Sequence, residues 1–304
     1  MIVNNIHKLK KTLNSNELSI FLFHGVIKNK LKNDSVRNYN SKHIDQKKFE
    51  SYIKFLSKNG KAKTLNDIIY KNYKFKNNYI ITFDDGFYNN YKYALPILKK
   101  YKIPHIIYLT TNYVDKNLIS WIDRVDIAVD NCKKKSIYSN MFEKEFRLGT
   151  KKNKIIFLDY VRNYCKLLKK TDLNNFTEIL LKDLKLKSPK TSKSDLDKKL
   201  EWKHIIKMNK NNLTEFGGHS HSHNILGHLS KPQYTAEINN SLNYLSKKAN
   251  LMIKHYSYPE GFKSSFNYDI IKLLKKRNIQ TCVTTLLTKK NKKSLFKLNR
   301  FFVI

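Results

Sequence analysis

Residues 80–87 read Ile-Ile-Thr-Phe-Asp-Asp-Gly-Phe, an apolar and β-rich run that ends abruptly in two acids and a glycine. Runs of similar character occur at 19–23 (SIFLF), 105–109 (HIIYL) and 282–285 (CVTT). Longer amphipathic stretches separate the four runs, and near-continuous apolar strands that alternate with helices are typical of a parallel sheet. The sequence therefore predicts an α/β fold built on a parallel sheet or barrel.

The stretches between the predicted strands carry apolar residues at helical spacing. The two clearest stripes are Phe49, Tyr52, Ile53 and Leu56, and Ile238, Leu242 and Leu245. Ser230 and Pro232 precede the second stripe, and a capping residue followed by an early proline is typical of a helix start. We therefore expect a covering helix in both places.

Residues from about 130 to 200 differ from the rest in being lysine-dense and mostly helical in pattern. Their apolar stripe consists of Ile156, Tyr160, Tyr164, Leu167 and Leu168. A loop at 188–193 closes the segment, and Ser194 is placed to cap a following helix, with Asp197 at the capping-box position. We predict a single domain over residues 1–304 that contains this segment as a helical insertion.

The net charge of +36 is the most unusual feature of the composition. Such a charge suggests a polyanion partner, either nucleic acid or an anionic membrane surface. However, lysine is spread through every segment, and no basic arm or nucleic-acid motif accompanies it. We therefore expect no specific nucleic-acid binding, and a polyanion-binding protein is a rival hypothesis of lower rank.

Cysteine spacing and apolar runs indicate the compartment. Cys132, Cys165 and Cys282 are far apart, so neither a disulfide framework nor a thiolate zinc site is predicted. No apolar run has the length of a signal-peptide core or a membrane span. The expectation is a cytoplasmic protein, with peripheral contact to the inner face of the membrane compatible with its charge. Nothing in the sequence indicates the oligomeric state.

The adjacent carboxylates Asp84 and Asp85 follow a predicted buried strand. Two such groups are costly at a strand end unless a cation compensates them, and a divalent metal does so well. The alternative is a surface turn, because Asp and Gly are ordinary turn residues.

Three histidines at alternate positions lie in the stretch 217–223, Gly-Gly-His-Ser-His-Ser-His. On a helical turn, His219 and His223 point the same way and can share a metal, whereas in an extended segment His221 joins them on one face. The two glycines at 217 and 218 are expected to let the backbone turn tightly after a strand at 213–216.

The motifs Thr-Phe-Asp-Asp-Gly at 82–86, His-Ser-x-x-His at 219–223 and Tyr-Ser-Tyr-Pro-Glu-Gly at 256–261 occur in this order. Together they resemble the polysaccharide deacetylases of carbohydrate esterase family four, the nodulation-type deacetylase domain. The resemblance covers roughly residues 15–130 and 200–304. It implies a distorted (β/α) barrel of the polysaccharide deacetylase type, with the active site at the carboxyl ends of the strands.

The resemblance also implies roles for five residues. Asp85, His219 and His223 resemble the family's metal ligands, and Asp84 resembles its general base. The backbone N–H of Glu260 is placed to stabilise an oxyanion. The implied cofactor is a divalent metal, with Zn²⁺ the first choice for two histidines and one carboxylate. The implied reaction removes an acetyl group, foremost an N-acetyl, from a sugar or glycan in polysaccharide or glycoconjugate biosynthesis, and an O-acetyl ester is chemically open at the same site.

The sequence departs from better-known members of the family in two places. Ser257 stands where they have an arginine that orients the base, and residues 281–304 contain no histidine to supply the acid. His24 resembles a histidine on the first strand of an exopolysaccharide-acting branch, and we predict that it is the acid. Arg300 is a candidate replacement for the arginine, with a surface ion pair as the alternative.

Two further alternatives follow from these features. Trp121 is a candidate for stacking on a sugar face, although packing in a core is the more common role of tryptophan. The missing arginine and late histidine also favour, as a rival hypothesis, a catalytically impaired member of the family that only binds carbohydrate.

Overall fold

A curled ten-stranded sheet forms the centre of the molecule in the computed structural model, which describes residues 2–15, 18–28, 31–70, 76–286 and 294–304. Every strand pair in this sheet is parallel, in the order β1-β14-β2-β6-β7-β10-β11-β12-β13, with β5 beside β6. The strands are β1 (Ile2–Val3), β2 (Ser19–Phe23), β5 (Lys61–Ala62), β6 (Asn78–Phe83), β7 (His105–Leu109), β10 (Thr214–Gly218), β11 (His255–Ser257), β12 (Thr281–Thr284), β13 (Leu298–Asn299) and β14 (Phe301–Val303). The predicted parallel α/β fold is confirmed.

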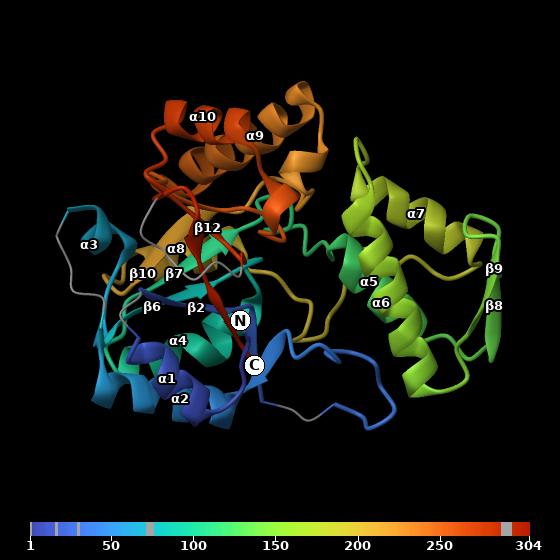
Figure 1. Cartoon of the computed structure of the whole chain (residues 1–304), viewed down its shortest axis with the longest axis horizontal. Helices are drawn as coiled ribbons and strands as arrows, with labels where there is room; N and C mark the ends of the chain where they lie inside the picture. The colour runs from blue at the N-terminus through green and yellow to red at the C-terminus, as the bar shows by residue number, and fades with distance from the viewer. Residues whose placement is uncertain (1, 16–17, 29–30, 71–75, 287–293) are drawn as a thin grey trace.

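Helices cover the outer face of the sheet (Figure 1). Those outside the lysine-rich segment are α1 (Ile6–Leu13), α2 (Gln46–Asn59), α3 (Leu65–Tyr70), α4 (Leu95–Lys100), α8 (Trp202–Asn209), α9 (Lys231–Ala249) and α10 (Tyr268–Lys276), with short turns at η1 (Asn90–Ala94), η2 (Leu226–His228) and η3 (Lys263–Ser265). Helix α9 begins after Ser230, as the start signal predicted, and the structure adds a capping box of Ser230 and Gln233. The apolar stripes of α2 and α9 are buried against the sheet.

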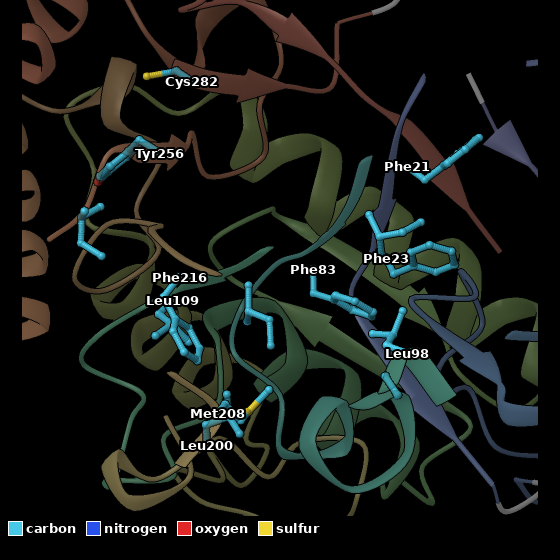
Figure 2. Close-up of a cluster of buried hydrophobic side chains, with 14 of the residues drawn as sticks. Phe21, Phe23, Phe83, Leu98, Leu109, Leu200, Met208, Phe216, Tyr256 and Cys282 are labelled. Carbon is cyan, nitrogen blue, oxygen red and sulfur yellow. The ribbon is translucent and has the colours of Figure 1, made fainter. Parts of the chain in front are cut away.

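The two faces of β6 show why its end forms a site. Successive strand residues point to opposite faces. Ile81 and Phe83 belong to the large core beneath the helices, where Figure 2 shows Phe83 beside Phe23 of β2 and Leu98 of α4. Ile80 belongs to a smaller apolar group inside the curled sheet, formed by Leu18, Ile20, Leu65, Ile80, Ile106, Tyr108, Val283 and Leu298. The alternation therefore brings the next even positions, Thr82 and Asp84, to the inside.

The end of the chain nearly closes the barrel. Strand β13 pairs with β12, whereas β14 pairs with β2 on the other side of the sheet, and only Arg300 separates β13 from β14. The chain thus passes directly from β13, at one edge of the sheet, to β14, which lies near the other edge. Arg300 is 3% exposed at this crossing.

The lysine-rich segment forms a second lobe with its own apolar core (Figure 1). It consists of α5 (Trp121–Asp130), the antiparallel pair β8 (Ser136–Ser139) and β9 (Lys144–Arg147), α6 (Lys151–Leu167) and α7 (Leu173–Asp183). The lobe starts at α5, before the predicted beginning near residue 130, and the helical pattern did not indicate its hairpin. Trp121 is 1% exposed in this core, so it packs rather than stacks on a sugar.

The helix expected after Ser194 is not present. Ser194 caps a single turn, in which its carbonyl accepts from the N–H groups of Asp197 and Lys198. Asp197 instead pairs with Arg37 at 2.5 Å, and the next helix starts at Trp202. A small parallel pair, β3 (Gly25–Ile27) and β4 (His43–Asp45), lies outside the main sheet.

Candidate active site

Asp84 and Asp85 both face the interior because the backbone changes direction between them. Each is 3% exposed. Consecutive strand residues point to opposite faces, but Asp85 has φ 69° and Gly86 has φ 66°, which ends the strand alternation. A positive φ is unfavourable for a residue with a Cβ, and such conformations are found at functional sites. The surface-turn alternative for these residues is therefore wrong.

Arg300 holds Asp84 through both carboxylate oxygens. Its Nη1 and Nη2 donate to Oδ1 and Oδ2, each at 2.7 Å. Nη2 also donates to Ser257 Oγ at 3.0 Å, and Ser257 Oγ donates to Asp84 Oδ2 at 3.3 Å. Burial by itself raises the pKa of Asp84, but the guanidinium of Arg300 outweighs it and holds this pKa below its usual range. Arg300 thus supplies the cation that is missing at position 257. The alternative, that Arg300 forms only an ion pair at the surface, is wrong.

The glycines before the histidines serve close packing rather than a turn. Gly217 and Gly218 are the last two residues of β10. A Cβ at Gly217 would lie 2.4 Å from the ring of Tyr108, and one at Gly218 would lie 2.7 Å from the ring of Tyr256. The expectation of a tight turn at these two positions was wrong, because the turn comes later.

The histidine segment is neither a helical turn nor a strand. Ser220 and His223 both have φ 61°, which folds the segment after β10 into a compact loop. Ser220 Oγ accepts from the N–H of His223 at 2.9 Å and so fixes the loop internally. His219 and His223 nevertheless come together, with ring centroids 4.9 Å apart.

Asp85, His219 and His223 form a cluster whose ligand atoms all lie within 4.8 Å of one another. Asp85 Oδ1 lies 3.5 Å from His219 Nε2 and 3.2 Å from His223 Nε2. His219 Nδ1 donates to the carbonyl of Ser257 at 2.8 Å, which leaves its Nε2 lone pair free for a metal. Two imidazoles and one carboxylate, all buried, match the donor set of a three-ligand divalent site.

His221 lies outside this cluster. Its Nδ1 is 2.9 Å from Thr111 Oγ1, and its ring lies beside Tyr244. Its backbone N–H and that of Ser222 both donate to Glu237 Oε2, at 2.8 and 2.9 Å. Glu237, on α9, thus anchors the loop between the two metal-ligand candidates, and no motif in the sequence indicated this role.

Lys42 lies on the opposite side of Asp85 from the histidines. Like Glu237, it is a residue that no motif in the sequence indicated. Its Nζ is 3.1 Å from Asp85 Oδ2 and 3.1 Å from Asp123 Oδ2. Burial by itself raises the pKa of Asp85, but Lys42 and His223 hold it well below its usual range. A single lysine among 60 basic residues carries no local signal, so only the tertiary structure identifies it.

His24 and Glu260 approach the site from opposite ends of the chain. His24 follows β2 and packs edge-on against Phe302, with ring centroids 5.4 Å apart. Burial lowers the pKa of His24 to about 4, against a smaller opposing effect of the two site carboxylates. Glu260 has φ 62°, and its carboxylate lies 3.4 Å from Lys166 Nζ of α6. The second lobe therefore contacts the third motif directly.

Comparisons with known proteins identify the family and the fold. The sequence profile of the family described as "Polysaccharide deacetylase" matches residues 71–282. No curated protein sequence matches the chain. In the described residues, no helix is both long and apolar enough to cross a membrane.

Several solved structures share the fold at low sequence identity. The Streptococcus pyogenes deacetylase PplD in complex with acetate matches with 15% identity and a TM-score of 0.59, over 95% of this chain and 92% of that chain. IcaB from Ammonifex degensii matches with 15% identity and a TM-score of 0.54, over 95% and 91%. The de-N-acetylase from Aggregatibacter actinomycetemcomitans matches with 14% identity and a TM-score of 0.55, over 94% of each chain.

The structural matches confirm the distorted barrel that the motifs implied. The range that the family profile matches contains all three motifs. The chain belongs to the polysaccharide deacetylase family.

Proposed function

We propose that this protein is a zinc-dependent hydrolase that removes an N-acetyl group from a sugar unit of a glycan or glycoconjugate. The observation that carries the proposal is that the Asp84–Arg300 pair lies next to the Asp85–His219–His223 cluster. Asp84, held by Arg300, lies 3.8 Å from His219 Nε2 of the Asp85–His219–His223 cluster. A base is thus fixed beside a site for a metal ion.

Asp85, His219 and His223 would hold the ion. A divalent ion bound by three protein ligands supplies a Lewis acid with open positions and lowers the pKa of a bound water. Zn²⁺ fits two imidazoles and one carboxylate. One of the structural relatives is a de-N-acetylase, which supports the choice of an amide over an ester substrate.

Asp84 acts as the general base in this proposal. It is ionised at neutral pH because Arg300 lowers its pKa. Oδ2 accepts from both Arg300 and Ser257, whereas Oδ1 accepts from Arg300 and keeps a second lone pair for the proton. It takes a proton from the attacking water. The bidentate arginine and Ser257 fix the direction in which the carboxylate faces.

His24 and Glu260 complete the proposed reaction. The backbone N–H of Glu260 stabilises the oxyanion, and the positive φ of this residue orients its peptide group. His24 donates a proton to the leaving amine. Because burial holds the pKa of His24 at about 4, this residue is neutral at pH 7 before substrate binds. It must therefore take up a proton from solvent before it can donate one to the amine, and the negative charge that develops in the site favours this uptake.

The test measures acetate release from N-acetylated and O-acetylated glucosamine oligosaccharides, with the metal-depleted protein and after Zn²⁺ is restored. We expect release from the N-acetylated substrates that requires the metal. Asp84→Asn should retain the metal and lose activity, and His24→Asn should retain the metal and lose activity against the amide. Acetate release that is unchanged in Asp84→Asn, or that proceeds without metal, would contradict the proposal.

A further inference from the structure

The two oxygens of Asp85 have different surroundings. Oδ1 faces the two histidines and has no hydrogen-bond partner within the described part of the chain. Oδ2 lies 3.1 Å from Lys42 Nζ. The Lys42 side chain is 13% exposed and that of Asp85 is 3% exposed, so solvent screens this contact little. One oxygen is therefore aimed at the metal site, and the other is bound to an ammonium.

Lys42 is itself fixed from its other side. Its Nζ donates to both oxygens of Asp123, at 3.3 and 3.1 Å. Asp123 lies in the first turn of α5, where Ser120 Oγ donates to Asp123 Oδ2 at 2.7 Å and accepts from its N–H. The ammonium is thus held between a carboxylate of the second lobe and a carboxylate of the barrel.

A neighbouring lysine shows that charge alone does not create this arrangement. Lys199 Nζ lies 3.3 Å from the centroid of the Phe87 ring, and Lys42 Nζ lies 4.8 Å from the same centroid. Lys199 Nζ is buried and has no hydrogen-bond partner within the described residues, so it makes no bond to Asp85. Lys199 therefore provides a matched control for Lys42.

We propose that Lys42, anchored by Asp123, keeps Asp85 a one-oxygen ligand of the metal and so preserves the open positions that water and substrate need. The inference rests on the proposed metal site. A carboxylate can bind a metal through one oxygen or both, and each additional protein ligand atom uses a coordination position. Lys42 acts as a positioning residue, because it touches the ligand and not the reacting atoms.

The experiment replaces the metal with Co²⁺, whose visible absorption weakens as its coordination number rises. Wild-type protein should bind one Co²⁺ and give the intense bands of a low-coordinate site. In Lys42→Met, Oδ2 is released and can bind the ion, so we expect weaker bands and acetate release that is lower by roughly 10–100-fold. Lys42→Arg, which can still donate to both carboxylates, should restore the spectrum. Lys199→Met removes the same charge beside the same ring and should leave the spectrum unchanged.

The outcomes separate this inference from the proposed function. If wild-type protein binds no Co²⁺, the proposed metal site is wrong and the inference fails with it. If wild-type protein binds Co²⁺ and folded Lys42→Met gives the same spectrum, the inference alone is overturned. Circular dichroism checks folding, and if Lys42→Met does not fold, Asp123→Ala takes its place. That variant leaves Lys42 without its anchor, so an unchanged Co²⁺ spectrum there would equally overturn the inference.

Discussion

Arg300 and Asp84 are joined by two hydrogen bonds of 2.7 Å, although 216 positions separate them in the sequence. Arg300 also donates to Ser257 Oγ and to the carbonyl of Thr284, so it connects β6, β11 and β12 inside the barrel. A planar guanidinium matches a carboxylate with two parallel bonds, which an ammonium cannot do. The position of the proposed base, Asp84, is therefore set at the point where the chain nearly closes the barrel.

Replacing Arg300 should impair the base without removing the metal. In Arg300→Met, the pKa of Asp84 rises because its cation is lost, so the acid limb of the kcat/KM profile should move to higher pH. Arg300→Lys keeps the charge but not the paired bonds, and we expect a smaller shift. The measurements are pH–rate profiles and metal content. An acid limb that stays in place in both variants would show that Asp84 is not the titrating base.

The same substitution should also lower stability. Removing one partner of a buried ion pair leaves the other charge uncompensated, at a cost of about 3–5 kcal/mol. Urea denaturation of Arg300→Met and of the Arg300→Met, Asp84→Asn double variant measures this cost. We expect the double variant to recover part of the loss, because it no longer buries an unpaired carboxylate.

The three histidines of the loop should differ in their effect on metal binding. His219→Ala and His223→Ala each remove a proposed ligand, and we expect both variants to lose stoichiometric zinc after dialysis. His221→Ala should retain zinc, because its imidazole contacts Thr111 and Tyr244 instead. Metal analysis of the three purified proteins checks this. If His221→Ala lost zinc and the other two variants retained it, the assignment of His219 and His223 as ligands would be wrong.

Glu237 should stabilise, from outside the site, the loop that carries the two proposed histidine ligands. In Glu237→Ala the N–H groups of His221 and Ser222 lose a charged acceptor, and such bonds are worth about 1.5–3 kcal/mol. We expect a lower melting temperature and a zinc affinity reduced by roughly 10–100-fold. Glu50→Ala, which breaks only the surface pair with Lys100, is the control and should change neither quantity. Unaltered zinc affinity in Glu237→Ala would contradict the role.

A buried histidine that is not part of the three motifs should make stability depend on pH. Burial lowers the pKa of His105, on β7, to about 4 from 6.5. The unfolded chain therefore binds a proton below pH 6.5 that the folded protein accepts only near pH 4. Stability from this residue is present above pH 6.5 and falls as the pH decreases toward 4.

The check on His105 is urea denaturation at pH 7 and pH 5. Each unit of pKa shift corresponds to about 1.4 kcal/mol, so the loss on acidification should be measurable. His105→Gln, which cannot gain the proton, should lose less stability than the wild type between these two pH values. Equal losses in both proteins would show that His105 does not contribute.

Local sequence patterns predicted much of the scaffold. The apolar runs became β2, β6, β7 and β12, and the stripes ending at Leu56 and Leu245 became the buried faces of α2 and α9. These patterns are readable because strand and helix periodicity depends on neighbours only a few residues away. The turn expected at Gly217 and the helix expected after Ser194 were wrong, because packing of Tyr108 and the pairing of Asp197 with Arg37 decided those conformations.

The sequence by itself determined the parallel α/β scaffold, the family and the grouping of Asp84 and Asp85 with the histidine motif. Only the tertiary structure decided how the motifs act together. It placed Arg300 on Asp84 and Lys42 on Asp85, and it fixed the loop through Glu237. The physical reason is that these bonds join segments whose proximity follows from barrel closure and lobe packing, and no short-range periodicity in a chain so rich in lysine marks the basic residues that take part.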